Sequence, residues 1–114
     1  MKRFKYAYNG MMQMFRKDTH FLIHILISLI VIISGFIFQL SAVEWLFILS
    51  AVFLVLTVEA LNTSIEYAVD LVTEDFHELA LYAKDISAFA VVLVSIYAVC
   101  TGLIIFLPKL LNLI

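Results

Sequence analysis

Long apolar runs separated by short polar stretches dominate the chain. No Lys, Arg, Asp or Glu occurs between residues 19 and 43, and further apolar runs cover residues 45–58 and 86–107. The helix predicted over the second run is longer than the run itself, because its helical pattern continues past Glu59 without glycine or proline. Each segment can then cross about 30 Å of hydrocarbon at about 1.5 Å per residue. We predict three membrane-spanning helices, at about residues 20–40, 43–72 and 79–107.

The first residues show a different pattern, typical of an amphipathic helix. Phe4, Tyr8, Met11 and Phe15 recur at spacings of four, three and four, which places them on one helical stripe. Most basic side chains of this segment lie off the stripe, as in helices that rest on a membrane surface. We predict a surface helix at about residues 2–17. It serves either as a topology anchor alone or also as the cover of a site on the same side.

Composition agrees with a bilayer protein and excludes several other classes. Of the 114 residues, 65% are hydrophobic and 14% are charged, and the mean hydropathy is +1.12. A soluble domain carries roughly 25% charged residues. The single cysteine, Cys100, excludes an internal disulfide scaffold. We expect an all-α integral membrane protein forming one domain over residues 1–114, and no cleavable signal segment.

The basic residues predict an orientation. Five of the seven Lys and Arg residues precede the first span, and Lys84 ends the connection between the second and third spans. Because excess positive charge stays in the cytoplasm, the N-terminus and that connection are expected inside. Trp45 is then placed to anchor the outer interface, and Lys109 is an isolated exception on the outside.

The second span carries a polar stripe. At about 100° per residue, Glu59, Asn62, Glu66 and Asp70 fall within roughly 80° of arc, whereas Tyr67 is assigned to the opposite side. If the helix enters the hydrocarbon near residue 43, Glu59 lies about one turn inside the cytoplasmic boundary. A carboxylate inside the bilayer costs on the order of 2–4 kcal/mol. Glu59 could snorkel or bond to a neighbouring helix, but we favour a site at the depth of a lipid head group.

Other polar side chains gather near the same boundary: Asp18, Asp75, His77, Lys84 and Asp85. Oxygen-rich sites suit Mg²⁺ rather than Zn²⁺. Carboxylates, Mg²⁺ and a lysine together suit phosphoryl transfer. Three scattered glycines exclude a Walker A loop and a glycine-rich kinase loop. The ordinary alternatives are a solvated loop for Asp75 and His77, a charge at a helix N-terminus for Asp85, and snorkelling for Lys84.

One stretch of the second span resembles a known signature. The stretch is Glu59-Ala-Leu-Asn62-Thr-Ser-Ile-Glu66-Tyr-Ala-Val-Asp70, followed by His77-Glu78-Leu79 and Ala83-Lys84-Asp85. It is similar to the signature of the prokaryotic diacylglycerol kinase family, and the resemblance runs from about residue 2 to residue 108. Residues 43–53 and 101–109 look like the Gram-positive branch, whose members act mainly as undecaprenol kinases.

The resemblance implies a homotrimeric helical bundle in the bacterial cytoplasmic (inner) membrane. It implies transfer of the γ-phosphoryl group of ATP, with Mg²⁺, to the hydroxyl of undecaprenol. Diacylglycerol is the alternative lipid substrate. A non-catalytic assembly protein or a cation channel subunit is the more distant alternative, because a carboxylate ring in an oligomer can bind cations.

The resemblance also implies roles for individual residues. Glu59 matches the catalytic base and Asn62 its polar neighbour, while Asp18 and Glu66 match the metal ligands. The residues expected at the nucleotide are Tyr6, Asp18, Glu66, Asp70, Asp75, His77, Lys84 and Asp85.

The chain departs from the family pattern before the first span. Asp18 stands where the family usually has a glutamate, and its arm is one methylene shorter. The Gram-positive pattern Asn-Phe-Arg-Ile-His keeps its aromatic residue and its final histidine, His24, but lacks the asparagine and arginine. We expect His24 to be a packed neutral core histidine rather than a functional group. Lys2 or Arg3 is expected to replace a basic nucleotide contact found in some members.

Overall fold

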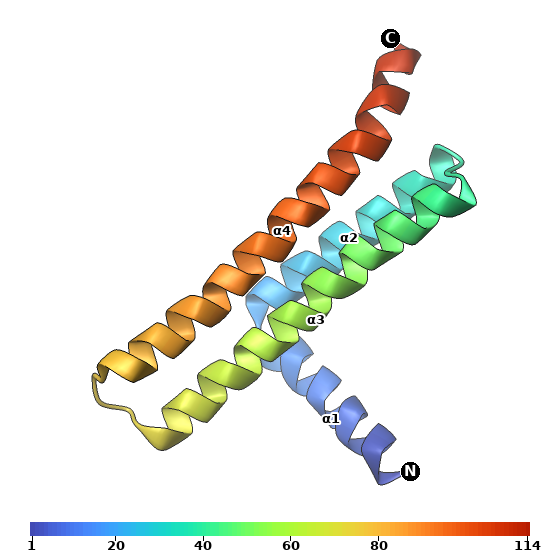
Figure 1. Cartoon of the computed structure of the whole chain (residues 1–114). Helices are drawn as coiled ribbons and strands as arrows, with labels where there is room; N and C mark the ends of the chain where they lie inside the picture. The colour runs from blue at the N-terminus through green and yellow to red at the C-terminus, as the bar shows by residue number, and fades with distance from the viewer.

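The computed structural model describes residues 1–114 and consists of four helices without a strand. These are α1 (Lys2–Lys17), α2 (Thr19–Ile37), α3 (Ala42–Val72) and α4 (Glu78–Leu113). The last three are long and apolar enough to cross a membrane. Figure 1 shows α2 and α4 running alongside α3, while α1 diverges from the bundle near the start of α2. The predicted all-α fold with three candidate spans is confirmed.

A short turn joins α2 to α3 at one end of the bundle. Gln39 adopts a left-handed backbone with φ of 55°. The Leu40 N–H donates to the Gly35 carbonyl at 3.2 Å and the Gln39 N–H to the Phe36 carbonyl at 3.3 Å. These two bonds form the Schellman motif that ends many helices. The motif explains why α2 ends at Ile37 rather than near residue 40.

The start of α3 is fixed by a capping box directly after this turn. The Ser41 Oγ accepts a hydrogen bond from the Glu44 N–H at 3.2 Å, and Glu44 Oε1 accepts one from the Ser41 N–H at 3.0 Å. Each bond satisfies an N–H group that a helix start leaves without a partner. The antiparallel pairing of α2 and α3 therefore follows from two adjacent helix caps.

Trp45 packs into a space that only a glycine leaves open. Its ring lies beside Phe36, with ring centroids 4.9 Å apart. A Cβ atom built on Gly35 would lie 2.6 Å from the Trp45 Cη2 atom. Close by, the buried side chains Leu40, Ile48 and Ile105 form the apolar core of this end. Gly35 thus permits the close approach of α2 and α3.

The fourth helix continues beyond the predicted third span. The prediction ended near residue 107, whereas α4 includes Pro108 and runs to Leu113. A proline inside a helix removes one backbone hydrogen bond, yet the apolar residues that follow remain helical. Lys109 Nζ then lies 3.0 Å from Glu44 Oε2, so the isolated basic residue of this end has an acidic partner.

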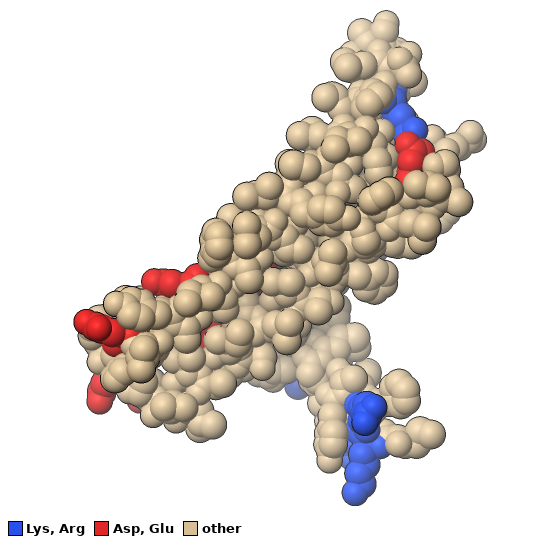
Figure 2. Space-filling model, viewed as in Figure 1, with Lys and Arg blue, Asp and Glu red and all other residues tan.

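Charged side chains concentrate at the two ends of the molecule. In Figure 2, Lys and Arg side chains lie on α1, mainly toward its free end, and Asp and Glu side chains gather near the connection between α3 and α4. A surface without Lys, Arg, Asp or Glu separates them from a single basic–acidic pair at the far end. This distribution matches a protein whose middle section lies in hydrocarbon.

Few residues are buried in a single chain. Only 12 of the 114 residues are buried, and four of these, Glu59, Thr63, Ser87 and Thr101, are polar or charged. An ordinary core buries mainly apolar side chains. Three of the four, Glu59, Thr63 and Ser87, lie among the polar contacts of α3 with α2 and α4, whereas Thr101 lies one turn before Ile105 of the apolar core.

Replacing Gly35 with alanine should destabilise the bundle. The added Cβ would overlap the Trp45 ring, and overpacking of this kind costs about 1–3 kcal/mol. Thermal unfolding in detergent, followed through the fluorescence of Trp45, the single tryptophan, should show a lower Tm for Gly35→Ala. Gly10→Ala is the control because nothing lies within 4 Å of a Cβ atom at Gly10. Equal Tm values for the two variants would contradict the packing described.

Replacing Gln39 with glycine should have the opposite effect. Gln39 holds a left-handed conformation that costs a residue with a side chain about 1 kcal/mol and costs glycine little. The same unfolding measurement should show a higher Tm for Gln39→Gly. A Tm at or below that of the wild type would argue against a left-handed residue at this turn.

Candidate active site

Polar side chains of α3 form two rows on neighbouring faces of the helix. Residues four positions apart lie one above the other on a helix. Glu59 and Thr63 form one row with Tyr67, and Asn62 and Glu66 form the other with Asp70. The first row meets the start of α2 and the end of α1, and the second meets the start of α4.

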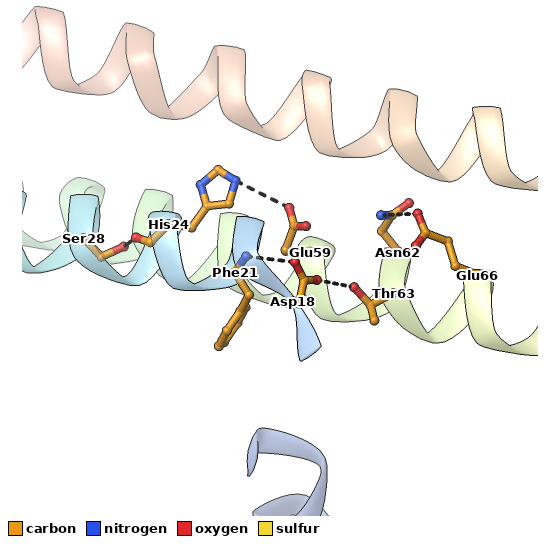
Figure 3. A network of polar contacts seen from close by, with 8 residues as sticks. All are labelled: Asp18, Phe21, His24, Ser28, Glu59, Asn62, Thr63 and Glu66. Carbon is orange, nitrogen blue, oxygen red and sulfur yellow. Dashed lines mark hydrogen bonds and ion pairs between the residues drawn. The ribbon is translucent and has the colours of Figure 1, made fainter. Parts of the chain in front are cut away.

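Asp18 connects the first row to the start of α2. Its Oδ1 accepts a hydrogen bond from the Phe21 N–H at 3.0 Å, which caps α2. Its Oδ2 accepts one from the Thr63 hydroxyl at 2.6 Å (Figure 3). The carboxylate at the mouth of α2 is therefore fixed by two donors, one from each helix, and a charge-assisted bond of this length is a strong one.

Glu59 and His24 meet one helical level deeper. His24 Nε2 lies 3.5 Å from Glu59 Oε2 (Figure 3). Glu59 is only 5% exposed, and the His24 ring is about one quarter exposed. A buried carboxylate requires a charge or hydrogen-bond partner, and within one chain His24 occupies that position. The expected packed core histidine is therefore a direct neighbour of the proposed base.

The second row is tied to α4 through Ser87. The Ser87 hydroxyl donates to Asn62 Oδ1 at 2.6 Å, and the Asn62 Nδ2 group donates to Glu66 Oε1 at 3.2 Å. One turn further along α3, Lys84 Nζ lies 2.6 Å from Asp70 Oδ1. The small, buried Ser87 thus allows close contact between α3 and α4 and also orients the Asn62 amide.

A polar cavity and an apolar groove meet at the Glu59–His24 contact. The cavity, of about 420 Å³, is lined by Lys17, Asp18, Thr19, His20, Glu59, Asn62, Thr63, Glu66 and Tyr67. The groove, of about 370 Å³, runs between α2, α3 and α4 and has nine hydrophobic residues among the 13 that line it. His24 and Val55 line the groove, and Val55 lies one turn before Glu59 on α3. An elongated apolar molecule with a polar end fits such an arrangement.

Four of the ten predicted site residues line the cavity, namely Asp18, Glu59, Asn62 and Glu66. Asp70 and Lys84 pair with each other beside it. The other four, Tyr6, Asp75, His77 and Asp85, lie outside the cavity in a single chain.

Two of these outlying residues have local structural contacts. The His77 Nδ1 atom accepts a hydrogen bond from the Leu79 N–H at 3.1 Å and so caps α4. The main chain of Asp75 bonds to the Thr73 hydroxyl at distances of 3.1 and 3.3 Å. A nucleotide role for either side chain stays a prediction.

The expected position of Tyr67 was wrong. Tyr67 lines the cavity instead of the opposite side of α3, and Gln13 Nε2 of α1 donates to its hydroxyl at 3.4 Å. The polar face of α3 is wider than the predicted arc because Thr63 and Tyr67 continue the row of Glu59 in steps of four. That spacing was a signal already present in the sequence.

The cavity offers oxygen donors for a cation. Asp18 and Glu66 both line it, although no group of three or more His, Cys, Asp or Glu side chains lies close enough to hold a metal ion by itself. Mg²⁺ commonly binds through one or two protein carboxylates and takes its other ligands from water and substrate phosphates. Two carboxylates in a polar cavity therefore fit Mg²⁺ bound together with a phosphate-bearing molecule.

The same geometry suits proton transfer from an alcohol. A general base must lie within hydrogen-bond reach of the proton that it removes. Glu59 lies where a hydroxyl at the end of an apolar chain in the groove would enter the polar cavity. The second reactant, a phosphate-bearing molecule, would lie in the cavity, where carboxylates and the basic side chain of Lys17 surround it.

Comparison with known proteins identifies relatives along nearly the whole chain. The family model described as prokaryotic diacylglycerol kinase matches residues 5–106. An undecaprenol kinase of Bacillus subtilis (strain 168) is 39% identical over 109 residues, which cover 96% of this chain and 89% of that protein.

Diacylglycerol kinases are also similar. That of Synechocystis sp. is 39% identical over 96% of this chain and 63% of its own length. That of Escherichia coli (strain K12) is 39% identical over 59% of this chain and 55% of its own length. The resemblance seen in the α3 stretch is confirmed, and the chain belongs to the prokaryotic diacylglycerol kinase family.

Proposed function

We propose that the protein is a membrane lipid kinase that transfers the γ-phosphoryl group of ATP to the hydroxyl of undecaprenol. The observation that carries this proposal is the position of Glu59, a buried carboxylate where an apolar groove meets a polar cavity. A soluble alcohol would need no apolar groove, and a purely structural carboxylate would need no cavity. Family membership supports the same class of reaction.

In the proposed reaction Glu59 takes the proton of the lipid hydroxyl. The hydroxyl oxygen forms a bond to the γ-phosphorus while the bond from that phosphorus to the bridging oxygen breaks, and ADP leaves with the electron pair. Positioning and charge stabilisation supply most of the catalysis in such transfers. The Asn62 amide, fixed by Ser87 and Glu66, lies one turn from Glu59 and helps to orient the reacting groups.

The carboxylates and the lysine would bind the phosphate groups of ATP. Asp18 and Glu66 would hold Mg²⁺, which neutralises phosphate oxygens when it is bound. Lys84 carries a further positive charge at the adjacent turn, where Asp70 fixes it at 2.6 Å. Tyr6, Asp75, His77 and Asp85 are proposed nucleotide contacts, and they need either movement of α1 and the loop or a neighbouring subunit to reach the cavity.

We propose undecaprenol rather than diacylglycerol as the lipid substrate. The Bacillus subtilis undecaprenol kinase matches this chain over 89% of its own length, whereas the diacylglycerol kinases of Synechocystis sp. and Escherichia coli match over 63% and 55% of theirs. Either lipid presents one hydroxyl at the end of an apolar body, so the chemistry at Glu59 is the same for both.

The proposed assembly is a homotrimer in the bacterial cytoplasmic membrane with the N-terminus in the cytoplasm. Apolar side chains such as Leu26, Ile30 and Ile104 are more than half exposed in a single chain. Lipid and neighbouring subunits would cover them. The basic residues of α1, on the side of the cavity, agree with a cytoplasmic N-terminus.

Glu59→Gln should lower the rate of phosphoryl transfer strongly without unfolding the protein. The amide keeps the shape of the side chain but does not accept the proton, and loss of a general base lowers the rate about a hundredfold or more. Purified protein in mixed micelles would be assayed with labelled ATP and with undecaprenol and diacylglycerol in parallel. Glu44→Gln, at the far end of α3, is the matched control and should remain active.

Two results would contradict the proposal. Full turnover by a folded Glu59→Gln variant would exclude Glu59 as the base. Wild-type protein that transfers no phosphate to either lipid, but conducts cations after reconstitution, would favour the non-catalytic alternative.

Glu66→Gln should change the metal dependence of the reaction. Replacing one of two proposed carboxylate ligands weakens Mg²⁺ binding, so half-maximal activity should require a several-fold higher Mg²⁺ concentration. A Mg²⁺ titration at saturating ATP measures this shift. An unchanged titration curve would remove Glu66 from the metal site, and Glu78→Gln, outside the cavity, serves as the control.

A further inference from the structure

Glu59 has one polar side-chain partner within the chain. Four titratable side chains surround it, namely Asp18, His20, His24 and Glu66. Asp18 is engaged by Phe21 and Thr63, and Glu66 is engaged by Asn62. Only His24 lies within ion-pair distance of the Glu59 carboxylate, at 3.5 Å from Oε2. Within the chain, His24 is therefore the side chain placed to orient that carboxylate.

His24 is held by the backbone of a well-anchored helix. The start of α2 is fixed to α3 through the Asp18–Thr63 bond. The Ser28 hydroxyl donates to the His24 carbonyl at 2.7 Å and leaves the imidazole ring free to face Glu59 (Figure 3). Two contacts thus connect α2 and α3 at successive levels, the shallower at Thr63 and the deeper at Glu59.

The imidazole lies on the lipid side of the site. His24 lines the apolar groove but not the polar cavity. A lipid alcohol that approaches along the groove would pass the imidazole before its hydroxyl reaches Glu59. A nitrogen that carries hydrogen can donate to a carboxylate oxygen in both the neutral and the charged ring.

We infer that His24 is the positioning residue of Glu59. Its ring binds one carboxylate oxygen, Oε2, and so turns the other oxygen toward the lipid hydroxyl. This inference deepens the proposed lipid kinase function and rests on it. An unpinned carboxylate would sample several rotamers, and a misplacement of about 1 Å in a reacting group can cost about a hundredfold in rate.

The test compares two substitutions at His24 in the full-length protein. His24→Leu removes the donor and keeps an apolar side chain at the groove, whereas His24→Gln restores an N–H donor at similar reach. Phosphoryl transfer from Mg²⁺-ATP to undecaprenol in mixed micelles gives kcat and the KM values for both substrates. Thermal unfolding of each variant provides the structural readout.

We expect a selective loss of kcat. His24→Leu should lower kcat about tenfold to a hundredfold with an unchanged KM for ATP, because His24 lies outside the polar cavity. His24→Gln should recover most of that loss. Ser34→Ala is the matched control, because the Ser34 hydroxyl of α2 also bonds only to a backbone carbonyl but lines neither the groove nor the cavity, and it should keep the wild-type kcat.

The inference has distinct ways to fail. Wild-type kcat in folded His24→Leu would overturn it, as would equal losses of kcat and thermal stability in the Leu and Gln variants, which would indicate a packing role. Absence of phosphoryl transfer in the wild-type protein would instead refute the proposed function itself.

Discussion

The burial of one carboxylate on a membrane-spanning helix constrains the half of this bundle that lies beside α1. An unpaired charge in hydrocarbon is costly, so Glu59 requires neighbours that are polar and fixed. His24 approaches it from α2, Thr63 holds the start of α2 in place, and Ser87 and Asn62 bring α4 close on the other side. Only the His24 contact reaches Glu59 itself, whereas the other two hold α2 and α4 in place around it.

α3 contributes both to the stability of the bundle and to the chemistry of the candidate site. Its N-terminal half packs Ile48 and Trp45 against small and apolar partners, whereas its C-terminal half carries two polar rows. The helix is uninterrupted between the halves, so the apolar packing that fixes the polar rows lies about three to four turns before Glu59. Stability and chemistry are thus separated along one helix rather than between domains.

Most of the fold was predictable from the sequence because it depends on run length and local caps. The three spans follow from apolar runs without helix breakers, and the Ser41–Glu44 capping box is a pattern of neighbouring residues. The left-handed Gln39 was not predictable, since a glycine or asparagine would be the usual residue there. The predicted end of the third span near residue 107 was too early, because a proline such as Pro108 near a helix end does not always stop the helix.

The candidate site was predictable only along a single helix. Periodicity on α3 placed Glu59, Asn62 and Glu66 on one face, and the cavity includes all three. The contacts of Asp18 with Thr63 and of His24 with Glu59 depend on the rotation of α2 about its own axis, which no pattern within one segment encodes. Tyr67 was misplaced for a different reason: its spacing of four from Glu59 and Thr63 is visible in the sequence, but the predicted polar arc was too narrow for a helix that contacts two neighbours.

The ion pair between Glu44 and Lys109 has a consequence for the way in which the chain enters the membrane. In the proposed orientation these are the formally charged side chains on the translocated side, and their charges cancel. A membrane potential does work of about 2.3 kcal/mol per elementary charge per 100 mV on a charge that crosses it. For a neutral pair that work is zero, so the membrane potential neither helps nor hinders the transfer of these two side chains. In the proposed orientation, the topology is then decided by the basic residues that remain in the cytoplasm.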